Sequence, residues 1–213
     1  MKQVNEAVEA ARALLRSALE NGEKDGGLTK ERYVRFLTMQ YHLTKGVQRH
    51  FLFIAGHPAT AKRRELRKWL INFAQEEEFH FEIAKTDLKE LGTEPGPIPF
   101  DTKLWWLYFN DIIADRPFVR LGATCILENI SDGSADVLDR MIQTSGFLTP
   151  KSLKFLTIHR HGPNLDHGDQ VLHAIEGAKL NDEEMADILE GTRLATVFYM
   201  RFIGWILTGK EVR

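Results

Sequence analysis

Glu77 and His80 are the two residues whose types and spacing most directly suggest chemistry. They interrupt an apolar stripe that advances in steps of three and four along one helix face: Leu66, Leu70, Phe73, Glu77, His80, Ala84, Leu88 and Leu91. An ionised carboxylate is costly to bury unless it is paired or bound to metal. A Glu-x-x-His pair on an inward helix face builds part of the metal site in carboxylate-ligated helical bundles. Oxygen and imidazole donors suit Fe(II) or Mn(II). The alternative is that the two residues pair with each other, or with an arginine, in a solvated seam.

Glu128 is a second candidate. It is the only charged residue in LGATCILENI, residues 121–130. A helix that is apolar nearly all round is expected in the centre of a protein, so this lone carboxylate needs an internal partner. A metal ion and a buried arginine, such as Arg120 or Arg193, are both open as that partner.

The third candidate is the segment IHRHGPNLDHGDQVLH, residues 158–173. It holds four histidines and two aspartates: His159, His161, Asp166, His167, Asp169 and His173. It is also consistent with an exposed helix end, where the helix dipole favours histidine. A di-iron site needs about four carboxylates and two histidines from several helices. Glu77, His80 and Glu128, with two or three groups from 159–169, would provide them.

Helices are the elements expected to position these side chains. Hydrophobic spacing and turn residues predict helices over about 3–21, 29–54, 60–91, 102–115, 117–144 with a kink at Gly133, 149–161, 164–177 and 181–207. Thr149-Pro150 and the pair Asn181 and Glu184 are typical helix starts. The only long irregular piece is 92–101, which holds three prolines. No segment alternates with period two, so we expect one all-α domain over residues 1–213.

Composition narrows the class of protein. The 28 basic and 30 acidic residues nearly cancel, which argues against a nucleic-acid-binding protein. The single cysteine, Cys125, excludes an intrachain disulfide. The most apolar stretch, 194–209, contains Arg201 and is short for a membrane span. The N-terminal residues lack the apolar core of a secretory signal. A cytoplasmic protein without membrane or nucleic-acid partners is therefore expected.

Three segments resemble the iron-containing branch of the haem-oxygenase-like superfamily, which includes non-haem di-iron oxidases and oxygenases. They are RYVRFLTMQYHLTKGVQRHF, EEEFHFEIAKTDLKELG and LGATCILENISDGSADVLDRM, and the resemblance extends over about residues 28–206. It implies a haem-oxygenase-like helical bundle of about seven to eight helices. It also implies that Glu77, His80 and Glu128, the last followed by the matching Ser131, are iron ligands. A proximal histidine for haem is missing from residues 3–21.

The chain departs from the family's third motif, His-x-x-x-Asp-x-x-His. Asp166 and Asp169 have the spacing of its last two members, so an aspartate replaces the final histidine. The first histidine would fall on Gly162, and His161 is the nearest substitute. A mononuclear iron site, a dinuclear site with an altered ligand, and an empty site are therefore all open.

The resemblance implies an iron-dependent oxidase or oxygenase that acts with O2 on a small organic substrate. The substrate itself cannot be read from the sequence. The alternative is a metal-free binding or interaction protein that retains the bundle and has lost the metal site. Relatives are often dimers, and the aromatic helix that contains LWWLYF, residues 104–109, is a candidate homodimer interface.

Overall fold

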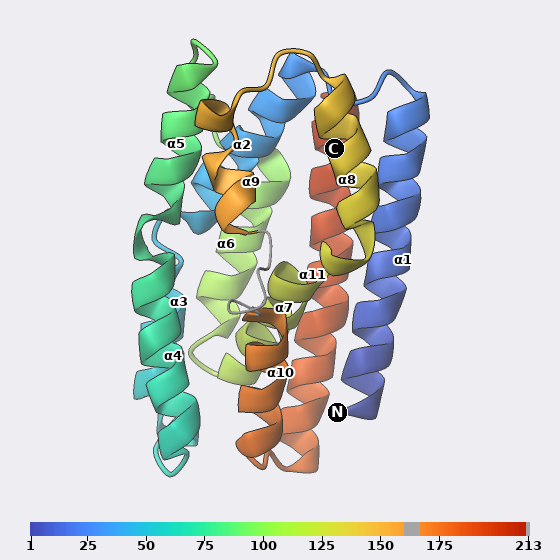
Figure 1. Cartoon of the computed structure of the whole chain (residues 1–213). Helices are drawn as coiled ribbons and strands as arrows, with labels where there is room; N and C mark the ends of the chain where they lie inside the picture. The colour runs from blue at the N-terminus through green and yellow to red at the C-terminus, as the bar shows by residue number, and fades with distance from the viewer. Residues whose placement is uncertain (160–166, 212–213) are drawn as a thin grey trace.

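The computed structural model describes residues 1–159 and 167–211, without the side chain of His167. The all-α prediction is confirmed, and the described residues form no strand. The α-helices are α1 (Lys2–Lys24), α2 (Lys30–Thr44), α3 (Gln48–Gly56), α4 (Arg64–Glu76), α5 (His80–Glu90), α6 (Phe100–Ile112), α7 (Pro117–Asn129), α8 (Ala135–Thr144), α9 (Lys154–Ile158), α10 (His167–Gly177) and α11 (Asp182–Thr208). Figure 1 shows the long helices running up and down around α7. No helix in the described ranges is long and apolar enough to cross a membrane.

Three of the expected helices are interrupted. The helix expected over 29–54 breaks between α2 and α3, where Gly46 has a φ of +88°, a conformation that favours glycine. The helix expected over 60–91 is divided by a 3-10 turn, Glu77–Phe79, between α4 and α5. The helix expected over 117–144 ends at Asn129, and a second 3-10 turn, Asp132–Ser134, leads into α8. The kink expected at Gly133 is thus a short change of helix type.

Helix starts follow the expected capping chemistry. The Thr29 hydroxyl accepts a hydrogen bond from the backbone N–H of Arg32. Asn181 and Glu184 form a reciprocal capping box at the start of α11. Thr149 starts a 3-10 turn, Pro150–Ser152, from which α9 continues only to Ile158.

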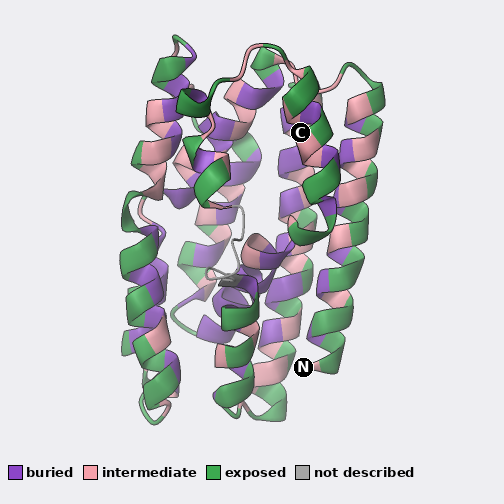
Figure 2. Ribbon diagram, in the orientation of Figure 1, coloured by how far each residue is buried: buried purple, intermediate pink, exposed green. Residues whose placement is uncertain are grey.

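The centre of the bundle is α7. Every one of its residues except Leu127 and Glu128 is buried, as Figure 2 shows for the helix in the middle of the molecule. The stripe predicted from the sequence is also turned inward, since all its members are buried except His80, which is half-buried. In the aromatic helix α6, Trp105 and Phe109 are fully buried within the chain, whereas Leu107 is 58% exposed.

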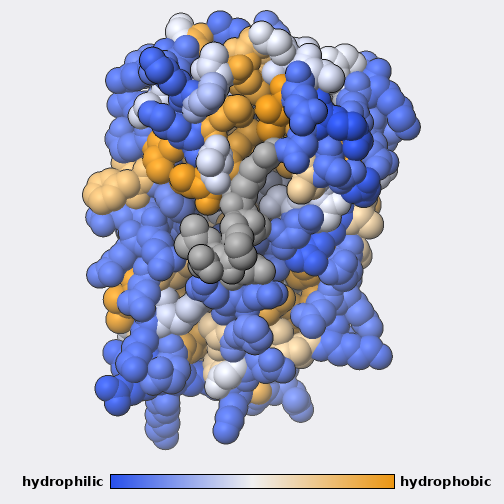
Figure 3. Space-filling model, in the orientation of Figure 1, coloured by the Kyte–Doolittle hydropathy of each residue, from blue (hydrophilic) through white to orange (hydrophobic). Residues whose placement is uncertain are grey.

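The end of α5 holds α9 in place. The Asp87 carboxylate accepts a hydrogen bond of 2.8 Å from the backbone N–H of Phe155, and the Tyr33 hydroxyl donates to the Ser152 carbonyl at 2.8 Å. Tyr33 and Phe155 belong to a small apolar cluster between α2, α5 and α9. In Figure 3, apolar side chains are visible between the positions of α9 and α8. The contact fixes α9, which ends at Ile158, the first residue of the histidine-rich segment.

Asp87 is expected to make stability depend on pH. Burial raises the pKa of this carboxyl in the folded protein, so its contribution to stability is present at low pH and is lost as pH rises through the raised value. Asp87→Asn keeps an oxygen acceptor for Phe155 and removes the titration. Relative to wild type, Asp87→Asn should therefore become more stable as the pH is raised from 4 to 8, when unfolding free energies are measured by urea denaturation. A difference that does not change with pH would contradict this.

Candidate metal centre

Glu77, which is buried, and His80, which is half-buried, form a pair at the junction of α4 and α5. Nδ1 of His80 donates to Oε2 of Glu77 at 3.0 Å, and the Glu77 residue is only 6% exposed. Its neighbours Glu76 and Glu78 are exposed. The 3-10 turn that begins at Glu77 separates the two residues from a regular helix, and such interruptions often mark functional sites. The pairing of Glu77 with His80, which was one of the alternatives open from the sequence, is therefore observed.

The same pair has donor chemistry that fits a divalent iron ion. Two neighbouring ligands on one octahedral ion, with bonds of about 2.1 Å, lie about 3.0 Å apart. The Glu77 oxygen and His80 nitrogen have this separation. Exchange of the shared proton for a metal ion would therefore need little movement of either side chain.

His159 lies against His80, with ring centroids 4.7 Å apart in an edge-to-face contact. Its Nδ1 donates to the Phe155 carbonyl at 2.7 Å, and its ring stacks on that of Phe155 at 4.2 Å. This bond places the lone pair of the neutral ring on Nε2, the arrangement that metal-binding histidines usually have. His159 is one of four histidines in the segment 158–173, and no spacing in the sequence singles it out.

Glu128 lies on the last turn of α7 and its charge acts on groups between α7 and α11. Burial, then the Glu128 carboxylate, raise the pKa of Tyr199 to about 12. Burial also raises the pKa of Cys125 to about 12, and Glu128 adds to that effect. Among the two arginines considered as partners, Arg193 is exposed and Arg120 is fully buried.

Arg120 links the two predicted carboxylates electrostatically. Burial lowers its pKa to about 10, while the charges of Glu128 and Glu77 oppose that change. Its Nε donates to Nδ1 of His50 at 2.9 Å and its Nη1 donates to the Thr124 hydroxyl at 3.0 Å. Glu77 and Glu128, which come from different helices, therefore act on one buried guanidinium.

The start of α10 lies beside the end of α7. The Asn129 side-chain amide donates to the carbonyls of Cys125 and Gly168, at 2.9 and 3.3 Å. Arg12 of α1 donates to the backbone and side-chain oxygens of Asn129 at 2.9 and 3.2 Å. Asp169 follows the buried Gly168 and is itself exposed.

The predicted ligand set is only partly within the described residues. His161 and Asp166 lie outside them. In residues 1–159 and 167–211, no three His, Cys, Asp or Glu side chains are grouped closely enough to hold a metal ion. The structure therefore brings Glu77 and His80 together but does not group Glu128 with them closely enough for a three-ligand site, and the third ligand source stays a prediction.

Comparison with known proteins identifies the family of the chain. Residues 34–200 match a family described as iron-containing redox enzymes, within the haem oxygenase group. A crystal structure of a domain of unknown function with a haem oxygenase-like fold, from Shewanella denitrificans OS217, is similar at a TM-score of 0.78 and 22% identity. The similarity covers 95% of this chain and 89% of that one. No curated protein matches the chain. The chain belongs to the iron-containing redox enzymes of the haem-oxygenase-like superfamily.

Proposed function

We propose that the chain is an iron-dependent oxidase or oxygenase that acts on a small organic substrate with O2. Membership of an iron-containing redox family supports the metal and the reaction class. The observation that supports the proposal most is the Glu77–His80 pair, whose possible metal-binding atoms are 3.0 Å apart. The substrate is a small molecule whose structure the site does not specify.

Glu77, His80 and Glu128 would hold the metal, and His161, Asp166 and Asp169 would complete its ligand set for one or two ions. When bound, reduced iron supplies the electrons and the open coordination position that O2 needs. The carboxylates and imidazoles are thus proposed as ligands rather than as acid and base.

The remaining contribution of the chain is to position and shield these groups. The hydrogen bond between Glu77 and Nδ1 of His80 holds the two side chains together in the metal-free protein. Asn129 ties the turn that carries Glu128 to the start of α10. Most residues of α7 are buried, so the helix that carries Glu128 is held in the interior of the bundle.

Iron content after anaerobic reconstitution with Fe(II) tests the proposal. We expect about one or two iron ions per wild-type chain, and a loss of at least tenfold in iron affinity for Glu77→Ala, because a first ligand is removed. Glu78→Ala is the matched control, since this exposed neighbour has the same charge. It should bind iron as wild type does.

Two results would count against the proposal. One is wild-type protein that takes up almost no iron. The other is equal iron content in wild type, Glu77→Ala and Glu128→Ala. Both would favour the metal-free binding protein that the sequence left open.

A further inference from the structure

Arg120 carries a positive charge in the interior, and in the part of the chain that the structure describes no carboxylate forms an ion pair with it. It is 0% exposed. Its two hydrogen-bond acceptors are the Thr124 hydroxyl, which has no charge, and the His50 ring. His50 is neutral as well, because burial and then the Arg120 charge lower its pKa to about 3. Among the described residues, Nη2 has no hydrogen-bond partner. Burying a cation in this way is costly unless nearby charges compensate for it.

The surroundings hold the guanidinium in one place. The rings of Phe51, Trp105 and Phe109 lie 5.1, 5.6 and 5.5 Å from its central carbon, a distance at which aromatic faces attract a cation. His50 is fixed in turn, since its Nε2 donates to the Asn110 side-chain oxygen at 2.8 Å. With two hydrogen bonds and three rings around it, the side chain has little freedom to swing away when another cation arrives.

The compensating charges are those of the proposed metal ligands. Glu128 lies two turns after Arg120 on α7. Glu77 lies one turn after Phe73, whose ring packs at 4.8 Å on that of Phe51 beside the guanidinium. Of the carboxylates that the structure describes, these two are the ones whose charges act on Arg120. In the metal-free protein they are drawn to the guanidinium, and the guanidinium is stabilised by them. A metal ion bound by the same carboxylates would be repelled by that fixed charge, because like charges interact over several ångströms in a poorly solvated interior.

We propose that Arg120 is a built-in cation of the carboxylate site, which stabilises Glu77 and Glu128 in the metal-free protein and weakens the binding of iron there. The inference rests on the proposed function for the identity of the metal. Arg120 is a positioning residue in this scheme and is not a ligand. It would keep iron affinity below the value that the donor set could otherwise reach.

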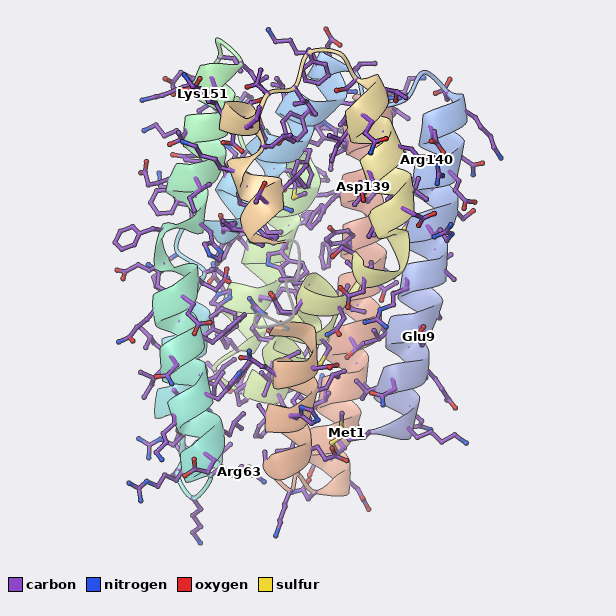
Figure 4. The ribbon with its side chains drawn as sticks, viewed as in Figure 1. Met1, Glu9, Arg63, Asp139, Arg140 and Lys151 are labelled. Atoms are coloured by element: carbon purple, nitrogen blue, oxygen red, sulfur yellow. The ribbon has the colours of Figure 1, made fainter. Side chains whose placement is uncertain are left out.

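Titration of the iron-free chain with Fe(II) under anaerobic conditions tests the inference. Arg120→Met should bind Fe(II) at least tenfold more tightly than wild type, and Arg120→Lys, which keeps the charge, should stay within threefold of wild type. Arg120→Gln is measured alongside, because it removes the charge but keeps a donor for His50. Arg140→Met is the control for loss of a positive charge elsewhere, since Arg140 lies on the outer surface of α8 (Figure 4).

The direction of the change in Fe(II) affinity distinguishes the loss of charge from structural damage. A neutral variant that merely disturbed packing would bind iron more weakly, and unchanged or weaker binding by folded Arg120→Met or Arg120→Gln would overturn the inference. Tighter binding by Arg120→Lys, equal to that of the neutral variants, would also overturn it.

A double-mutant cycle on the iron-free protein tests the electrostatic link between Arg120 and Glu77 without metal. Glu77→Gln should lower the melting temperature of wild type more than it lowers that of Arg120→Gln, because only wild type loses an attraction to the guanidinium. Additive effects would refute the electrostatic link. If wild type binds no iron while the cycle shows coupling, the proposed function fails and the electrostatic role of Arg120 stands.

Discussion

Gly191→Ala should prevent the chain from folding stably. α7 and α11 approach each other through two glycines that face the partner backbone reciprocally. A Cβ atom on Gly191 would lie 1.9 Å from the Val119 carbonyl oxygen, and one on Gly122 would lie 2.1 Å from the Ile188 carbonyl oxygen. Backbone atoms cannot move aside as a flexible side chain can, so one methyl group must push the two helices apart. We expect a loss of more than about 3 kcal/mol in unfolding free energy, at the upper end of overpacking effects.

Gly204→Ala, on the same helix, is the matched control. Gly204 is exposed and a Cβ atom there would meet nothing within 4 Å. Alanine should raise stability by roughly 0.5–1 kcal/mol, since it restricts the unfolded chain without strain. Urea denaturation followed by circular dichroism compares the two variants with wild type. Similar stability of Gly191→Ala and Gly204→Ala would show that α7 and α11 are not packed this closely.

The central place of α7 could be predicted because one residue stood out against its surroundings. Glu128 was the single charge in an apolar segment, and that segment is the most buried helix. The inward stripe through Glu77 was predictable for the same reason, since periodicity reports which face is buried. The helix breaks were harder to predict. Gly46 offered a local signal, whereas the turn at Glu77–Phe79 consists of residues that ordinarily continue a helix.

The rest of the site depends on contacts between distant parts of the chain. Arg120 and His50 are 70 residues apart, and the hydrogen bond between them exists only because α3 packs on α7. His159 comes close to His80 because Asp87 holds the helix before it. Neither contact leaves a spacing that a reader of the sequence could detect. The sequence therefore indicated which donors are present more reliably than which of them meet.

Gly168→Ala should weaken iron binding while leaving most of the fold intact. A Cβ atom at this position would lie 2.4 Å from the Asn129 side-chain oxygen and 3.1 Å from the Glu128 carbonyl oxygen. Asn129 cannot easily yield, because it is fully buried and bonded to Cys125, Gly168 and Arg12. The start of α10 must then move away from α7, and the proposed ligands of 161–169 would move with it.

Because positioning errors near a metal site typically cost 10- to 100-fold in affinity, we expect Gly168→Ala to lose about that much affinity for Fe(II). Its cost in unfolding free energy should be smaller than that of Gly191→Ala, since the contact lies at a helix end. Gly177→Ala, on the same helix with nothing within 4 Å of the added atom, should bind iron as wild type does. Equal Fe(II) affinity in Gly168→Ala and Gly177→Ala, measured anaerobically, would mean that the contact between α10 and α7 does not position any ligand. The metal would then depend on Glu77, His80 and Glu128 alone.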